Sequence, residues 1–241
     1  MLPSSDLSKN QVDRLGDRLR KGTVSESDLR LLDRYRRSFS EVYEDVVGTI
    51  RDRLGLEPTG RRAKSKTSII DKLQRESIRL SQMQDIAGCR VIVRDVKNQD
   101  EVIVRLRESF DTLTIDDRRK TPSHGYRAVH AIVHSVGKPI EIQVRTSLQH
   151  LWAELSEKFS DLIDPAIKYG GGDPDALDSL SVASEEIVEV ENYERLLSVA
   201  MQRGILEDMG LDILKAQQQI AAQRKRVMGL IESMGEIVPE D

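Results

Sequence analysis

The sequence has little cysteine and no long apolar run. Cys89 is the single cysteine among 241 residues, which excludes an internal disulfide framework. It lies in an apolar run, so we expect it to be buried. No apolar stretch approaches the roughly 20 residues of a membrane span, and the chain is polar from Ser4 onward, without a signal-peptide core. The sequence therefore predicts a cytoplasmic protein with no membrane partner.

A strong charge of either sign is also absent. The chain carries 37 basic and 41 acidic residues, so its net charge of -4 gives no overall preference for a polyanion, and any basic site must be local. With 38% hydrophobic and 32% charged residues, the composition indicates a soluble, helix-rich protein. The length suits one large domain with appendages or two small domains.

Two common kinds of site are missing as well. No segment matches the phosphate-binding pattern G-x-x-x-x-G-K-S/T, and the triple glycine at 170–172 lacks the following lysine. Four histidines fall in one window, but His130 and His134 are four residues apart on a predicted strand, hence about 13 Å apart. They cannot both ligate one ion at about 2 Å. A zinc site is therefore disfavoured.

Apolar spacing predicts the order of helices and strands. Ser65 or Thr67 can cap the second helical segment. Gly137-Lys138-Pro139 is typical of a hairpin turn between the last two strands. The predicted helical segments are 7–56, 68–80, 100–110, 147–159, 176–202 and 211–234, and the predicted strands are 86–93, 112–115, 126–136 and 140–146, with a polar loop at 116–125.

This order predicts an α/β (α+β) fold with a small mixed β-sheet and packed helices. We divide the chain into an N-terminal helical segment (1–56), a core (57–172) and a C-terminal helical extension (173–241). In the last helix an apolar residue recurs every seven positions, from Ile213 to Met234. Packing within the chain is favoured over a homo-oligomer contact, because Gln217 and Arg224 make the second seam position polar.

The segment E-I-Q-V-R-T, residues 141–146, has two chemically different faces. Side chains alternate along a strand, so Ile140, Ile142 and Val144 point to one side. Glu141, Gln143 and Arg145 point to the other. Such a polar face is either the solvated side of an edge strand or the floor of a site for a charged ligand.

Three further groups can carry chemistry. Arg61, Arg62, Lys64 and Lys66 precede a helix start, where an anion such as a polyphosphate is favoured, although a solvated basic loop is the commoner case. Tyr126 and His130 share one face of a predicted strand and suit a base and a phosphate, or else a half-buried tyrosine and a core histidine. Asp85 and Glu141 each lie near a strand start and can share Mg²⁺ if those strands are neighbours.

Together these groups resemble the synthetase domain of the RelA/SpoT homologue family. The resemblance spans residues 60–169, and its four blocks stand in the order typical of the family. It implies a nucleotidyltransferase-like core. The blocks are Arg62-x-Lys64-x-x-x-Ser68-Ile69-x-x-Lys72, Asp85-Ile86-x-Gly88-x-Arg90, Gly125-Tyr126-Arg127-x-x-His130 and Glu141-Ile142-Gln143-Val144-Arg145-Thr146, followed by Trp152-Ala153-Glu154.

The resemblance implies a pyrophosphokinase that transfers the β,γ-pyrophosphate of ATP to a ribose 3′-hydroxyl, usually of GDP or GTP. On the ATP side it implies that Arg62, Lys64 and Lys72 hold the phosphates, with Arg90 in the same pocket. It also implies that Asp85 and Glu141 hold Mg²⁺, with Glu141 placed to help deprotonate the attacking hydroxyl.

On the acceptor side, the resemblance implies that Tyr126 stacks on the base while His130, Gln143 and Arg145 position acceptor and transferring phosphates. Arg118, Arg119 and Lys120 precede the tyrosine and can serve a nucleotide phosphate or a tRNA backbone; a solvated loop is the plain alternative.

The chain departs from the long family members, because it shows no histidine-aspartate hydrolase domain and no long regulatory C-terminal region. Its Ser156-Glu157-Lys158 stretch resembles divergent, toxin-like members. Two other interpretations therefore stay open. The first is a toxin-like enzyme that makes adenosine alarmones or modifies the tRNA 3′ end, with a small antitoxin protein as partner. The second, suggested by the helices in 176–241, is a catalytically weak nucleotide-binding module.

Overall fold

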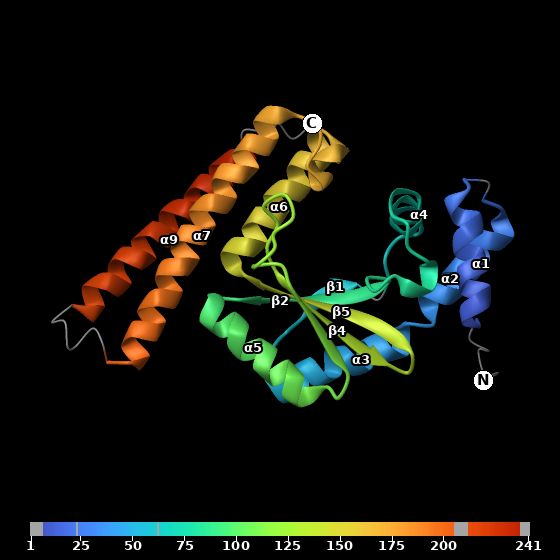
Figure 1. Ribbon diagram of the computed structural model, residues 1–241, viewed down its shortest axis with the longest axis horizontal. Coiled ribbons are helices and arrows are strands. Elements are labelled where there is room, and N and C mark those ends of the chain that lie inside the picture. Colours follow the sequence, from blue (N-terminus) through green and yellow to red (C-terminus); the bar gives the residue numbers. More distant parts are fainter. Residues whose placement is uncertain (1–6, 23, 62, 205–211, 237–241) are drawn as a thin grey trace. The chain divides into compact units, whose positions relative to one another are not determined.

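The computed structural model describes residues 7–22, 24–61, 63–204 and 212–236 (Figure 1). These form two compact units. The first comprises residues up to 91 together with 105–115 and 130–143, and the second comprises 92–104, 116–129 and the chain from 144 onward. Arg62, expected at the ATP phosphates, lies outside the described residues, as does the side chain of Arg61. Within the described residues, no helix is long and apolar enough to span a membrane.

Most strand residues lie in the first unit, in a five-stranded mixed sheet with the order β1-β2-β5-β4-β3. β1 runs antiparallel to β2 and places Gly60 opposite Cys89. The strictly alternating burial along β2 and the buried Ile140, Ile142 and Val144 of β5 show that each strand turns an apolar face to a core. The strands are β1 (Thr59–Arg61), β2 (Ala87–Val93), β3 (Leu113–Asp117), β4 (Val129–Ser135) and β5 (Lys138–Thr146).

The helices of the first unit confirm the helical prediction for residues 7–56. Ser8 and Ser25 form capping boxes at the first two helix starts, and Leu15, Leu32 and Phe39 are buried. The elements are α1 (Lys9–Arg20), α2 (Glu26–Arg37), α3 (Ser40–Thr49), the π-helical turn η1 (Ile50–Leu54), α4 (Lys66–Arg75) and the 3₁₀ turn η2 (Leu80–Gln82). The helix α5 (Val96–Ser109) begins in the second unit and ends in the first.

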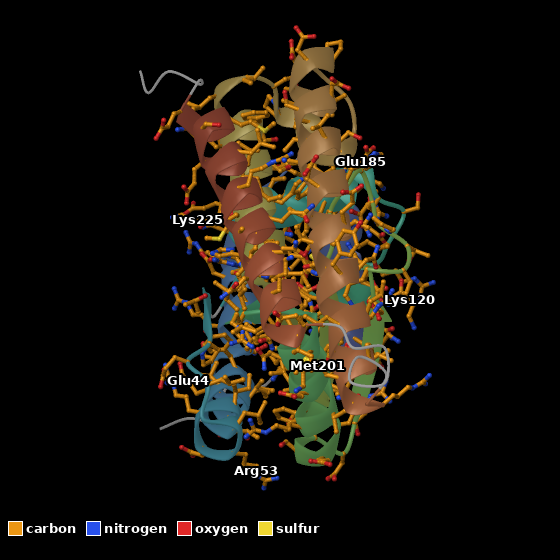
Figure 2. The ribbon with its side chains drawn as sticks, turned by 90° about the vertical axis from the view of Figure 1, so that its left-hand side faces the viewer. Glu44, Arg53, Lys120, Glu185, Met201 and Lys225 are labelled. Atoms are coloured by element: carbon orange, nitrogen blue, oxygen red, sulfur yellow. The ribbon has the colours of Figure 1, made fainter. Side chains whose placement is uncertain are left out.

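The second unit is mainly helical. It contains α6 (Ser147–Leu162), the 3₁₀ turn η3 (Pro165–Tyr169), α7 (Pro174–Gln202) and α9 (Ile213–Glu236), and Figure 2 shows α7 and α9 side by side. Its apolar core includes Trp152 and Phe159 of α6, Ile187 of α7 and Val227 of α9, with Met234 packed against it. The heptad residues Val227 and Met234 thus pack within the chain.

Several boundaries differ from the sequence prediction. Tyr126 is outside β4, which begins at Val129, so the expectation that Tyr126 and His130 share one strand face is wrong. The left-handed backbone of His124 (φ 50°) and Gly125 (φ 84°) makes a turn there, and the Tyr126 N–H donates to Ser123 O. The hairpin turn is Val136–Gly137, because Lys138 and Pro139 already belong to β5.

Two differences concern whole elements. β1 is not anticipated, because three residues are too short to show a hydrophobic period and only the pairing with β2 makes them a strand. The helix expected over 68–80 ends at Arg75, and Glu76 has extended backbone. The other predicted helices and strands are present with shifted ends, and the mixed α/β class is confirmed.

Candidate functional site

Two lysines converge on one carboxylate in the first unit. Lys64 Nζ lies 2.7 Å from Asp85 Oδ2, and Lys72 Nζ lies 3.0 Å from Asp85 Oδ1. Local structure fixes both lysines, because the Lys64 N–H donates to Ile86 O and Ser65 caps α4, the helix that carries Lys72. The side chains of Lys64 and Lys72 are only 16% and 22% exposed. Lys64 and Lys72 therefore form an ordered pair of cations at Asp85.

The lysines keep Asp85 ionised. Burial acts to raise the pKa of Asp85, but the charges and hydrogen bonds of Lys64 and Lys72 outweigh burial and hold that pKa below its ordinary value. Lys66, from the same basic segment, pairs instead with Asp33 of α2 at 3.0 Å. Lys64 and Lys72 thus lie at the candidate site, whereas Lys66 links α4 to α2.

Glu141 is held by its neighbours on the sheet. His130 Nδ1 on β4 lies 2.8 Å from Glu141 Oε1, and Gln143 Nε2 donates to Glu141 Oε2 at 2.8 Å. Burial and the charge of Asp85 act to raise the pKa of Glu141, but the bonds from His130 and Gln143 lower it below its ordinary value. Glu141 is therefore an ionised, oriented carboxylate at neutral pH.

β2, which follows Asp85, and β5, which carries Glu141, are neighbours, as the metal hypothesis requires. β2 and β5 are adjacent in the sheet. Gly88 of β2 allows this close approach, because a Cβ atom there would lie 2.7 Å from Glu141 O. Arg90 shares with Gly88 the less buried face of β2.

The donor set fits Mg²⁺ better than a closed metal site. Asp85 and Glu141 carry like charges close enough for Asp85 to raise the pKa of Glu141, and a cation between them would relieve that repulsion. Among the described residues no group of three or more His, Cys, Asp or Glu is arranged to hold a metal ion. Mg²⁺ commonly takes one or two protein carboxylates and completes its shell with water and phosphate oxygens.

An aromatic cavity of about 130 Å³ lies in the second unit. The rings of Tyr126 and Trp152 have centroids 6.4 Å apart, and Arg145 Nη2 donates to Tyr126 Oη at 3.1 Å. The guanidinium carbon of Arg145 is 5.1 Å from the centre of the Tyr126 ring, and that of Arg118 is 6.0 Å from it. Two arginines thus flank a tyrosine that has the shape and charge to receive an anionic aromatic ligand.

The helix α7 supports this aromatic cavity. Trp152 Nε1 donates to Leu180 O at 2.8 Å, and Ser184 Oγ donates to Gly125 O at 3.0 Å. Sequence reasoning missed both contacts and used Trp152 only as an apolar helix residue and as part of the Trp152-Ala153-Glu154 match. The tryptophan after the Glu141 strand was the available signal; no pattern in α7 pointed to Ser184.

The structure separates the basic triplet at 118–120. Arg118 faces Tyr126, whereas Arg119 is bound by Asp117 at 2.8 Å and Asp100 at 2.7 Å. Arg119 and Lys120 line a second cavity, of about 310 Å³, which shares no lining residue with the first. Only Arg118 of the triplet therefore lies at the tyrosine.

Comparison with solved structures identifies the fold of this chain. The small alarmone synthetase 1 of Bacillus subtilis, solved with its product pppGpp, is 26% identical with a TM-score of 0.53, covering 76% of this chain and all of that one. A GTP pyrophosphokinase family protein of Streptococcus pneumoniae is 22% identical with a TM-score of 0.54, covering 75% of this chain and 97% of that one. The fold is thus that of the small alarmone synthetases.

The sequence comparisons point to one group of proteins. Residues 61–160 match the model of the region found in RelA / SpoT proteins. An uncharacterized protein of Mycobacterium tuberculosis is 33% identical over 180 aligned positions, covering 67% of this chain and 62% of that protein. The GTP pyrophosphokinase of Haemophilus influenzae is 29% identical over 130 aligned positions, covering 52% of this chain and 17% of that enzyme. Residues 61–160 are thus similar to the region found in RelA / SpoT proteins, and the chain spans less than two thirds of the length of these relatives.

Proposed function

We propose that this chain is an ATP-dependent pyrophosphokinase that transfers the β,γ-pyrophosphate of ATP to the 3′-hydroxyl of GDP or GTP. The observation that carries the proposal is the pair of ionised carboxylates, Asp85 and Glu141, with Lys64 and Lys72 beside Asp85. The match of residues 61–160 to the RelA / SpoT region and the likeness to a synthetase solved with pppGpp support it.

The chemistry needs positioning and charge neutralisation more than a protein nucleophile. The acceptor O3′ forms a bond to the β-phosphorus of ATP, the bond from that phosphorus to the AMP oxygen breaks, and the hydroxyl proton passes to solvent. In this proposal Lys64 and Lys72 leave Asp85 when ATP binds, and they then contact the negatively charged oxygens of the ATP phosphates. Arg90 adds charge from β2.

Asp85 and Glu141 would hold Mg²⁺, which supplies neutralisation of the phosphate charge when bound. The lowered pKa of Glu141 favours this ligand role over proton acceptance, because a weakly basic carboxylate takes up a proton poorly. His130 and Gln143 orient Glu141 through its two carboxylate oxygens. We assign Tyr126 to the acceptor base, with Arg145 and Arg118 as the cations beside it.

Conversion of ATP to AMP, measured with purified protein, Mg²⁺ and GDP or GTP, tests the reaction. We expect Glu141→Gln to reduce turnover by about 100-fold or more, because the amide keeps the shape but loses the charge. Glu41→Gln, at an exposed position of α3, is the matched control and should keep wild-type activity. Full activity of Glu141→Gln, or no AMP and no 3′-pyrophosphorylated product from the wild type, would contradict the proposal.

The acceptor is decided by a screen with GDP, GTP, AMP, ATP and tRNA. We expect guanosine nucleotides to be the best acceptors. Product formed on tRNA or on an adenosine nucleotide, with none on GDP or GTP, would keep the chemistry and replace the acceptor. Nucleotide binding without any AMP would instead identify a binding module.

A further inference from the structure

The second cavity of the second unit has no part in the proposed transfer. It measures about 310 Å³, at the lower end of ordinary ligand sites. We propose that it binds the phosphate group of a small molecule and that its occupant acts on the Tyr126 cavity. The residues that matter are Arg119, Lys120, Arg127, Glu191 and Arg195.

The charge inside this cavity favours an anion. Its lining holds four cationic and three acidic side chains. Asp117 and Asp100 both form ion pairs with Arg119, at 2.8 and 2.7 Å. Arg119 offsets one of these two negative charges and Lys120, which is 81% exposed and 3.9 Å from Asp117, offsets the other (Lys120 is labelled in Figure 2). Arg127 and Arg195 are the cations left over.

The remaining carboxylate is already engaged. Glu191 accepts a bond from Thr146 Oγ1 at 2.6 Å and bonds from Gln149 Nε2 at 3.0 and 3.1 Å. Burial raises the pKa of Glu191. Even when Glu191 is charged, one carboxylate stands against Arg127 and Arg195, so the lining keeps one net positive charge.

Arg127 is the cation that most needs a partner. Its Nη1 donates to Arg119 O at 3.1 Å, but its Nε is buried without a hydrogen-bond partner among the described residues. Burial also lowers the pKa of Arg127. Arg127 lines the cavity, and the N–H groups of a planar guanidinium match the geometry of phosphate oxygens.

Two covalent connections link this cavity to the Tyr126 cavity. Tyr126 and Arg127 are consecutive, and each lines a different cavity. Thr146, which Glu191 binds, directly follows Arg145, the partner of Tyr126 Oη. A phosphate that attracts Arg127 and repels Glu191 therefore acts on both Tyr126 and Arg145. Its effect on acceptor use rests on the proposed function, whereas the binding itself does not.

Pyrophosphate titration by calorimetry tests the site, with Lys72→Ala as the background to weaken binding at the lysines beside Asp85. We expect saturable binding in this background. Adding Arg195→Gln should weaken it about tenfold or more, because a charge-assisted bond is lost. Arg226→Gln, an exposed arginine of α9 outside the cavity, is the control that should bind as the background does.

Trp152 reports the coupling, because it is the single tryptophan and touches Tyr126. Pyrophosphate should change its emission in the Lys72→Ala background and not after Arg195→Gln is added. Equal calorimetric affinity with and without Arg195→Gln overturns the site, even if ATP is converted to AMP. Binding of GDP in place of pyrophosphate supports it with a nucleotide as occupant. Binding of an RNA oligonucleotide alone overturns it, and unchanged Trp152 emission overturns the coupling.

Discussion

At the scale of single residues, the two carboxylates of the first unit are stabilised in different ways. Asp85 faces two lysines, whereas Glu141 accepts bonds from a histidine and an amide. The alternation of residues 140–146 predicted the polar face that carries Glu141 and Gln143, since it depends only on strand period. The bond between His130 and Glu141 depends on which strands are neighbours, and a single sequence does not contain that information.

The lowered pKa of Asp85 makes stability depend on pH. Its ion pairs stabilise the fold fully above the ordinary carboxyl pKa of about 3.9, and the stabilisation is lost as the pH falls through the depressed native value. We expect Asp85→Asn to lower the free energy of unfolding by about 2 kcal/mol at pH 7, because two part-buried lysines lose their partner.

Urea unfolding at several pH values measures this effect. The difference between wild type and Asp85→Asn should shrink as the pH falls below about 4. Asp45→Asn, at an exposed position of α3, should match the wild type throughout. A difference that is the same at pH 7 and at pH 3 would show that the ion pairs are not its source.

At the scale of elements, long amphipathic helices were predictable and short or turn-dependent pieces were not. The stripe ending at Leu54 and the apolar face of α6 repeat over several turns, which is enough to identify a helix. β1 has three residues and is a strand because it pairs with β2, so its own sequence does not predict it. Tyr126 lies outside β4 because the backbone at His124 is left-handed and makes a turn. Histidine in a sequence does not indicate such a turn, whereas glycine does.

Gly88 is the residue on which the approach of β2 to β5 depends. We expect Gly88→Ala to destabilise the protein by about 1–3 kcal/mol and to abolish most turnover, because the new methyl group would meet Glu141 O at 2.7 Å and force Glu141 away. Gly48→Ala is the matched control in α3. It meets no atom within 4 Å, so it should raise stability by up to about 1 kcal/mol. Thermal unfolding and AMP release measure both, and equal effects would refute the role of Gly88.

At the scale of the whole molecule, the sequence predicted helices after residue 173 but not what they hold. The division into 1–56, 57–172 and 173–241 stays a prediction, and the compact units do not follow it. In the second unit, α7 and α9 complete the core around α6, and α7 also supplies the bonds to Trp152 and Gly125. Such packing joins distant segments, so periodicity alone does not reveal it.

Removal of the C-terminal extension tests this dependence. We expect residues 1–172 alone to lose cooperative folding of the second unit, because the buried side chains of α7 and α9 each contribute about 1.5–3 kcal/mol. The sum for Ile187, Val190, Val227 and Ile231 then approaches the whole stability of a typical domain, about 5–15 kcal/mol. Trp152 would lose its bond to Leu180 O and its apolar cover, so its emission should move to longer wavelength.

The fragment is compared with the full chain by tryptophan emission and urea unfolding, with Leu196→Ala, at an exposed position of α7, as the full-length control. A fragment that unfolds at the same midpoint as the full chain, with unchanged Trp152 emission, would show that the extension is independent of the aromatic cavity.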